Sequence, residues 1–458
     1  MSKFLKPAMG FAMAGASLLL ALTPWKSAQA VPSFAEQTGL ACNICHTQSF
    51  GPNLTSYGRE FKLRGYVDGT GSHPLKAPLS AMATGSFTHT DRGITDGPAP
   101  GYGDQNNFTF DQGSIFLAGR LAPKIGIFSQ VTYDGVADSV ALDETDIRYA
   151  DAANIQGVEL EYGVTLNNDP TTQDVWNTTP SWGYPATASP LAPTPGATAL
   201  IDGGLAGQVA GATAYAFING MLYVEAGGYR RFSKDAQNAL GTFDSGENEL
   251  RGTAPYWRIT LQNTDAGWNG HYVALGTFGM HADVRPGRAI GVGTDTMTDI
   301  GSDISYQYLS NPNHIFEAKA TYIYEDAKLH ATGLGGGASN ASDRLNTFRI
   351  NGSYTYDQIL TLTLAYTGIW GTTDVLRYVA SPIDGSRTGS PDSNSYAVDL
   401  AWVPFGKSGS YLAPYYNVRV DLMYTGYTKF NGASSNYDGN GRDASDNNTL
   451  LLNLWFFM

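Results

Sequence analysis

Two cysteines and a histidine near the start of the chain have types and a spacing that could do chemistry. They lie in the run Cys42-Asn43-Ile44-Cys45-His46, and no other cysteine occurs among the 458 residues. In a C-x-x-C-H motif the two thiols add to the vinyl groups of a haem, and the histidine that follows ligates the iron. The motif therefore predicts one covalent haem c, with His46 as the proximal iron ligand, and electron transfer as the chemistry.

Two other uses of the same residues are weaker hypotheses. A structural zinc site needs four ligands, and only His46 lies close to the two cysteines in sequence. A thioredoxin-like redox dithiol would be expected in a βαβ pattern, which is absent around this motif. Haem c remains the preferred interpretation of Cys42, Cys45 and His46.

The sequence offers several candidates for the sixth iron ligand. Met82 shares a face of a predicted strand with Thr84, and we expect that face to point inward, where the methionine could reach a haem. His73 lies in the connecting segment and is the competitor, whereas His89 falls on the outward face. A haem without a protein sixth ligand, with Met82 only packing against the haem segment, is the remaining alternative.

Basic residues follow the haem motif and could bind the haem propionates. Arg59, Lys62 and Arg64 lie within one short stretch, and a guanidinium group pairs with a carboxylate through two hydrogen bonds. They could equally pair with inward-facing acids of the rest of the chain. That set comprises Asp146, Asp399 and Asp421. Acids scattered over the long loops are interpreted as solvated side chains and not as a defined metal site.

The N-terminal residues and the net charge indicate where the protein is located and which partners it can bind. Residues 1–30 read as a secretory signal, with a basic start, an apolar core from Phe11 to Leu22 and a small-x-small end at Ala28-Gln29-Ala30. Removing it lowers the net charge from −13 to −16. A chain this acidic would repel phosphate backbones, so we expect no nucleic-acid partner.

The rest of the chain has the pattern of a membrane-spanning β-barrel. Charged residues make up only 15% of the whole sequence, and Gly and Tyr are abundant at 54 and 27. From residue 79 onward, about sixteen segments of roughly ten residues alternate with period two. In 314–325, for example, Phe316 and Tyr322 share one face, while Glu317 and Lys319 share the other. A soluble β-sandwich would show the same alternation.

The connections favour the barrel. Tight-turn residues such as Asn219-Gly220 and Pro312-Asn313 alternate with long polar links such as 168–204 and 373–392. Outer-membrane barrels have short periplasmic turns and long external loops. We therefore predict an all-β chain: an antiparallel transmembrane barrel of about sixteen strands (79–458), both termini periplasmic, with a small haem c domain (31–78) plugging the lumen.

The N-terminal residues also resemble a known family. They run Pro32-Ser33-Phe34-Ala35, Gln37-Thr38-Gly39, Cys42 to His46, Gln48, Leu54, Tyr57-Gly58-Arg59, Phe61-Lys62 and Gly65-Tyr66. This pattern is similar to that of the fused outer-membrane monohaem cytochrome–porins of iron-oxidising bacteria. The resemblance is specific over about residues 31–90 and rests on architecture and length beyond them. Met458 departs from the aromatic residue that usually ends such barrels, which bears on assembly.

The resemblance implies an activity, cofactors and partners. It implies an iron:cytochrome c oxidoreductase in the outer membrane of a Gram-negative bacterium, taking electrons from Fe(II) outside the cell. The electrons would pass through a single haem c to a soluble periplasmic c-type cytochrome. Alternatives are a conduit for another donor or for outward current, and a diffusion porin whose haem is regulatory. Outer-membrane lipid is a partner in every case, and the oligomeric state is left open.

Overall fold

The computed structural model describes residues 32–51, 53–67, 79–179, 181, 187–263, 269–412 and 416–458. The predicted signal peptide, residues 1–30, and His73 lie outside the described residues. Three short helices precede the sheet: α2 (Pro32–Thr38), α3 (Cys42–Cys45) and α4 (Ser56–Leu63). None of the helices in the described part of the chain is long and apolar enough to cross a membrane.

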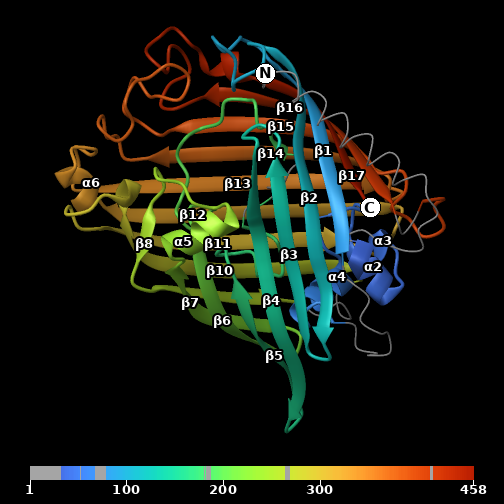
Figure 1. The fold of residues 1–458 in the computed structure, drawn as a ribbon. Helices are drawn as coiled ribbons and strands as arrows, with labels where there is room; N and C mark the ends of the chain where they lie inside the picture. The colour runs from blue at the N-terminus through green and yellow to red at the C-terminus, as the bar shows by residue number, and fades with distance from the viewer. Residues whose placement is uncertain are drawn as a thin grey trace, which may run out of the picture.

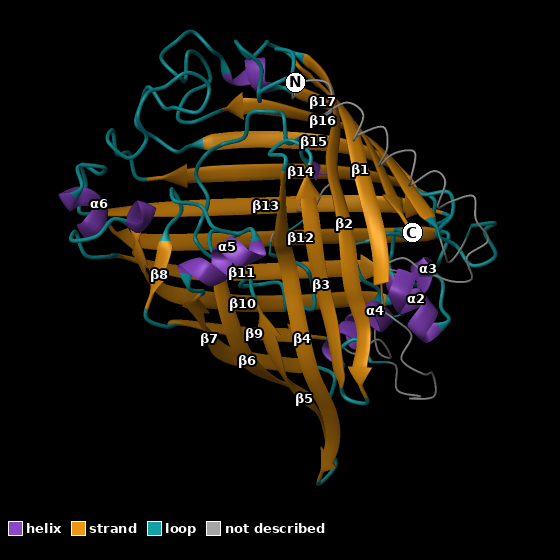
Figure 2. Cartoon of the chain, in the orientation of Figure 1, coloured by secondary structure: helices purple, strands orange, loops and turns teal. Residues whose placement is uncertain are grey.

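Strands make up most of the remaining chain (Figures 1 and 2). They are β1 (Leu79–Thr90), β2 (Asn106–Ala122), β3 (Ile125–Asp134), β4 (Ser139–Ile155), β5 (Val158–Asn167), β6 (Val209–Ile218), β7 (Leu222–Arg231), β8 (Glu249–Arg251), β9 (Ala254–Gln262), β10 (His271–Arg285), β11 (Asp295–Tyr308), β12 (His314–Lys328), β13 (Ser342–Tyr356), β14 (Leu360–Gly371), β15 (Ser393–Trp402), β16 (Asn417–Lys429) and β17 (Thr449–Phe457). Short helices lie in the connections: α5 (Lys234–Leu240), η2 (Pro286–Arg288), α6 (His330–Leu334) and η3 (Ala444–Asn447).

The strands close into an antiparallel barrel. Apart from β8, each pairs with its neighbours along the chain, and β1 also pairs with β17, with Met82 opposite Phe457 and Thr90 opposite Thr449. The three-residue β8 and the longer β9 both pair with β10 and occupy one position in the ring. The described strands therefore occupy sixteen positions around the barrel, which confirms the prediction of about sixteen.

The predicted alternation places apolar side chains outside and polar ones inside. On β12, Phe316 is 46% exposed, whereas Glu317 and Lys319 are buried inside the barrel. On β15, Leu400 is exposed and Asp399 is buried. An apolar outer surface with charges enclosed is the arrangement that a lipid bilayer requires of a barrel.

The two ends of the barrel differ. At one end, here called the short-turn end, the connections include the turn between Tyr356 and Leu360, and the helices α2–α4 lie there (Figure 1). The opposite, long-loop end carries α5, α6 and η3. The alternation has two exceptions. The β3–β4 link at the long-loop end spans only 135–138, and the β15–β16 link at the short-turn end spans 403–416.

One connection was predicted to extend outside the barrel but instead turns inward. The link between β5 and β6, predicted within 168–204 as one of the long polar connections outside the barrel, turns into the lumen. We call its described residues, 168–179, 181 and 187–208, the inner loop. Its side chains Trp176, Leu191 and Ile201 are buried, because the loop packs against the inner wall and contacts α4.

Candidate functional site

The haem motif forms a single helical turn. Within α3, Cys42 and Cys45 lie three residues apart and therefore on the same side of the helix. His46 follows in an extended conformation, and its backbone N–H donates to the Cys42 carbonyl at 2.9 Å. Thr55, which precedes α4, donates from its backbone N–H to the Cys45 carbonyl at 2.9 Å. These backbone contacts fix the two thiols and the imidazole relative to α4.

The motif supplies two free thiols and an imidazole that burial keeps neutral. Both thiols are free, and burial raises the pKa of Cys45 to about 12 and that of Cys42 in the same direction. Burial lowers the pKa of His46 to about 4, against an opposing contribution from the Asn53 backbone. A neutral imidazole is the form that binds iron. Its Nδ1 atom is buried without a hydrogen-bond partner among the described residues. The donor set therefore fits a haem c.

The barrel wall holds the haem segment (residues 31–78) by hydrogen bonds from more than one strand. Thr47 donates to Glu317 at 2.7 Å, and the Lys319 ammonium donates to the Asn53 side chain at 3.0 Å. Four strand positions farther round the wall, Arg419 of β16 donates to the side chain of Gln48 at 2.8 Å. Residues Thr47, Gln48 and Asn53 of the segment thus contact the inner wall of the barrel.

Arg59, predicted to bind a haem propionate, contacts the wall. Its guanidinium group donates to Gln307 at 2.5 Å and to the Leu54 carbonyl at 2.9 Å, and it stacks 3.7 Å from the Tyr272 ring centroid. These contacts account for its burial. A role toward a propionate stays a prediction.

Lys62, the second predicted propionate partner, binds the inner loop. Its ammonium donates to the carbonyls of Thr172 and Asp174, at 2.8 and 2.7 Å, and to the Asn177 side chain at 3.0 Å. Burial, followed by repulsion from Arg148, lowers its pKa to about 8. Lys62 therefore links the haem segment to the inner loop, and its role toward a propionate also stays a prediction.

The remaining basic residue and the inward acids pair elsewhere. Arg64 forms ion pairs with Glu60 and Glu161 at 2.7 and 2.6 Å. The acids suggested as alternative partners of the basic patch pair with wall arginines: Asp146 with Arg148, and both Asp399 and Asp421 with Arg419. Within the described ranges no group of three His, Cys, Asp or Glu side chains is placed to hold a metal ion.

Met82 lies where it was placed, on the inward face of β1 near the short-turn end. Its sulfur accepts a hydrogen bond from Trp455 Nε1 at 3.1 Å, in a buried cluster that includes Phe50 of the haem segment and Phe457. Its role as sixth ligand stays a prediction. His89 faces outward and contacts Asn106 at 2.8 Å, while His73 lies outside the described residues.

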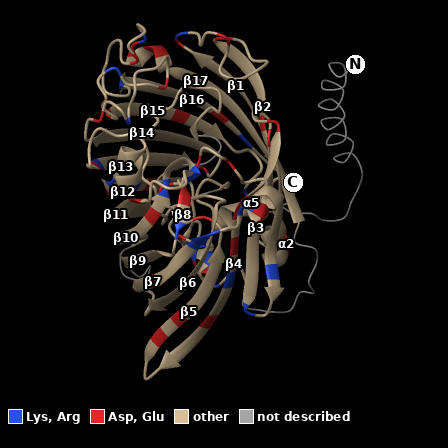
Figure 3. Cartoon of the chain, turned by 60° about the vertical axis from the view of Figure 1, so that its left-hand side comes forward, with Lys and Arg blue, Asp and Glu red and all other residues tan. Residues whose placement is uncertain are grey.

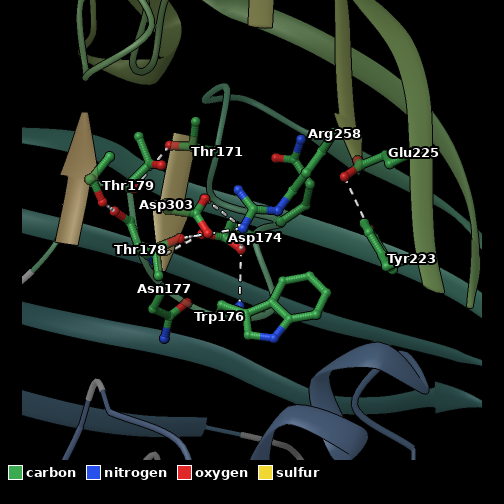
Figure 4. A network of polar contacts seen from close by, with 12 residues as sticks. Thr171, Asp174, Trp176, Asn177, Thr178, Thr179, Tyr223, Glu225, Arg258 and Asp303 are labelled. Atoms are coloured by element: carbon green, nitrogen blue, oxygen red, sulfur yellow. Dashed lines mark hydrogen bonds and ion pairs between the residues drawn. The ribbon is translucent and has the colours of Figure 1, made fainter. Parts of the chain in front are cut away.

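The inner loop is organised around Asp174, which sequence reasoning missed (Figure 4). Its carboxylate accepts the backbone N–H groups of Trp176 and Thr178, at 2.9 and 2.8 Å, and lies 3.4 Å from the Arg258 guanidinium. Arg258 also pairs with Asp303 at 2.8 Å. The signal that could have revealed the loop is a large aromatic residue, Trp176, in a polar connection otherwise interpreted as external.

A cavity of about 310 Å³ remains at the short-turn end. It lies between α4, the inner loop and strands β5, β9 and β10, and its lining includes Arg59, Arg64, Glu161, Trp176 and Tyr272. The lining is mixed polar and aromatic. Cys42, Cys45 and His46 do not line it.

Comparison with known proteins shows similarity to solved structures but does not assign the chain to a family. No family model matches the chain, and no curated protein matches it. Among solved structures, the anion-selective porin from Comamonas acidovorans has a TM-score of 0.46 at 11% identity, over 83% of this chain and 98% of that chain. Outer-membrane expressed OmpT of Vibrio cholerae has 0.44 at 8%, over 84% and 99%. OmpF of Salmonella typhi, in complex with daunomycin, has 0.42 at 13%, over 83% and 97%. The description of this chain as a closed sixteen-position barrel therefore rests on its own strand pairing.

Proposed function

We propose that the chain is an electron conduit of a Gram-negative outer membrane, which oxidises Fe(II) outside the cell and reduces a soluble periplasmic c-type cytochrome. The observation that supports this most strongly is the position of Cys42, Cys45 and His46 at one end of a closed barrel, where Asn43 contacts the connections at Gln358 and Gly406. Wall residues such as Glu317 and Arg419 hold the segment that carries them. In this proposal the segment plugs the lumen.

The orientation follows from the two ends of the barrel. Short turns of outer-membrane barrels face the periplasm and long loops face outward. The haem segment lies at the short-turn end, where the Ala81 N–H also donates to the Met458 carbonyl at 2.8 Å. Both described ends of the chain would then face the periplasm, where a soluble electron acceptor can reach the haem motif.

The chemistry divides between the cofactor and the chain. Haem supplies a one-electron couple, so each Fe(II) that becomes Fe(III) releases one electron, and one acceptor molecule is reduced by one electron. The chain's residues attach and enclose the group: Cys42 and Cys45 provide the thiols, and His46 provides a neutral imidazole. Oxidised iron forms insoluble oxide near neutral pH, and a plugged barrel keeps it outside. No general acid or base is needed.

A diffusion porin with a regulatory haem is the second candidate. The cavity of about 310 Å³ beside α4 favours it, because such a space could belong to a solute path. The inner loop, whose carbonyls accept hydrogen bonds from Lys62 of the haem segment, argues against a wide path. Conductance therefore distinguishes the two candidates.

The test is anaerobic mixing of the purified, oxidised protein in detergent with Fe(II) near neutral pH. We expect prompt reduction of the haem absorbance, and loss of covalent haem in Cys42→Ser and Cys45→Ser. Thr55→Ser, which keeps a hydroxyl beside the motif, is the matched control and should retain both properties. A haem that dithionite reduces but Fe(II) does not would exclude iron oxidation. Solute conductance in a planar bilayer would then favour the porin.

A further inference from the structure

Five arginines lie together at the long-loop end, where β7, β8 and β10 meet the connections (Figure 3). They are Arg230, Arg231, Arg251, Arg285 and Arg288. Lys and Arg number only 28 in the whole chain against 41 acids, so this concentration is unusual for the chain. We call these five residues the arginine cluster.

One carboxylate is shared among three members of the arginine cluster. Glu249 pairs with Arg231, with Arg285 at 2.7 Å and with Arg251 at 4.0 Å. The side chains of Arg231 and Arg251 are still 43% and 38% exposed. A single negative charge facing three guanidinium groups leaves a positive excess, and exposed donors remain open to a ligand.

The other two members contact neutral groups. Arg230 donates to the Thr253 hydroxyl at 2.7 Å. Arg288 donates to the Asp244 backbone carbonyl and to the side chains of Gln208 and Gln237, at 2.7, 3.2 and 2.9 Å. These contacts hold the guanidinium groups in place without neutralising them.

The nearby acids are engaged with other donors. Asp283, opposite Arg251 in the strand register, accepts from Thr296 at 2.7 Å. Asp244 accepts the backbone N–H of Gly246 at 2.7 Å, and Glu247 accepts from Gln208 at 3.1 Å. These neutral donors leave the carboxylates charged, so with Glu249 four carboxylates face five guanidinium groups, which leaves an excess of one positive charge.

Three members of the cluster, Arg230, Arg251 and Arg285, lie on the outward rows of their strands, on the side of the barrel that carries the apolar surface. Along β10, Leu275 is 55% exposed on the outer face, and Asp283 and Arg285 continue that same alternating row toward the long-loop end. The indole of Trp257 covers the outer face of Gly279 between them, since a Cβ at Gly279 would lie 2.9 Å from its Nε1. Apolar residues, an aromatic ring and then arginines follow in order, as at a membrane–water interface.

We propose that the arginine cluster binds the phosphate groups of a phosphorylated glycolipid in the outer leaflet. Guanidinium groups match phosphate oxygens through paired hydrogen bonds and are weakly hydrated, which suits an interfacial site. Arg230, Arg251 and Arg285 extend across three neighbouring positions of the sheet, roughly 10 Å at ordinary strand spacing. That span suits a headgroup with more than one phosphate. The inference rests on the outer-membrane location in the proposed function, and it is independent of the haem.

The test measures binding of purified diphosphoryl lipid A to the full-length protein in neutral detergent, by native mass spectrometry and by titration. The variant is the triple substitution Arg230→Gln, Arg251→Gln and Arg285→Gln. Its control removes the same number of positive charges at the same end, outside the cluster, through Lys328→Gln, Arg344→Gln and Lys429→Gln. Heat-modifiable migration on a gel verifies that each barrel is folded.

We expect the cluster variant to lose at least about ten-fold in affinity, because hydrogen bonds to charged groups contribute substantially to binding. The control should keep wild-type affinity. Equal losses in both variants, no loss in either, or equally effective competition by inorganic phosphate would overturn the proposal. Haem reduction by Fe(II), measured on the same wild-type sample, is a separate readout. Lipid binding without Fe(II) oxidation would refute the proposed function alone.

Discussion

Gly58 and Cys45 lie backbone to backbone. A Cβ atom on Gly58 would lie 2.3 Å from the carbonyl oxygen of Cys45, closer than any real contact allows. The same atom would lie 3.1 Å from the Leu54 side chain. The glycine therefore lets α4 approach the haem-motif turn closely enough for Thr55 to bind it.

Substitution Gly58→Ala should displace α3 from α4. We expect a loss of about 1–3 kcal/mol in local stability, the usual range for overpacking, and a lower ratio of covalent haem to protein. The ratio is measured by haem absorbance against polypeptide. Gly333→Ala is the control, because Gly333 is also in a short helix, and a Cβ there would meet no atom within 4 Å. Normal haem content in Gly58→Ala would contradict this contact's role.

Met82→Leu tests the proposed sixth ligand. Met82 Sδ accepts from Trp455, so ligation requires it to leave that hydrogen bond. We expect the variant to lower the reduction potential of the haem, because a methionine ligand raises it. The near-isosteric change should cost less than about 1.5 kcal/mol in stability. An unchanged potential, measured by redox titration, would mean that Met82 only packs in its cluster.

Lys62 predicts a pH dependence of stability. The folded-state pKa is lowered to about 8 from an ordinary 10.5, so between these values the unfolded chain binds more protons than the folded one. Stability therefore rises with pH across that window, by about 1–3 kcal/mol. Urea unfolding in detergent at several pH values should show this rise in wild type and lose it in Lys62→Met.

The control for that measurement is Lys407→Met. Lys407 forms a partly exposed ion pair with Asp357 at 2.7 Å at the same end of the barrel. We expect this variant to keep the wild-type rise. The same pH slope in Lys62→Met and wild type would show that the Lys62 ammonium does not cause it.

Asp174→Ala should release the inner loop. The substitution removes an acceptor from Trp176 and Thr178 and leaves the buried Arg258 with Asp303 alone. Breaking one side of a buried ion pair costs about 3 kcal/mol. We expect higher ion conductance in planar bilayers, since the loop occupies the lumen.

Asp244→Ala is the matched control for that loop variant. Its carboxylate also accepts a backbone N–H two residues ahead, but in an exposed long-loop segment. Conductance should remain at the wild-type level. If conductance rose equally in both variants, the rise would not be specific to release of the inner loop.

The wall was predictable because strand alternation is local. Phe316 and Glu317 are adjacent, and their opposite environments follow from the period of a strand alone. The inner loop was not predictable in the same way, because Asp174 meets Arg258 only after the barrel closes. The division of one barrel position between β8 and β9, at Gly252 with φ of +68°, likewise depends on the neighbouring β10.

In the candidate site, too, the local features were predictable from the sequence and the long-range contacts were not. Cys42, Cys45 and His46 fall within a single turn, so their spacing was enough to bring them together. Their supports come from far along the chain: Gln48 and Arg419 are separated by 371 residues. Arg59 and Lys62 were found as basic residues near the motif, but their acceptors on the wall and the inner loop have no sequence signature.

The packing of Phe50 makes the haem segment depend on β17. Phe50 lies 4.7 Å from Trp455 and 5.1 Å from Phe457, measured between ring centroids. Both partners belong to β17, which also closes the ring against β1. A polypeptide truncated before residue 449 would contain the whole haem motif yet leave Phe50 without these rings. Contacts this distant in sequence form slowly, so Phe50 is packed only once β17 has joined the barrel.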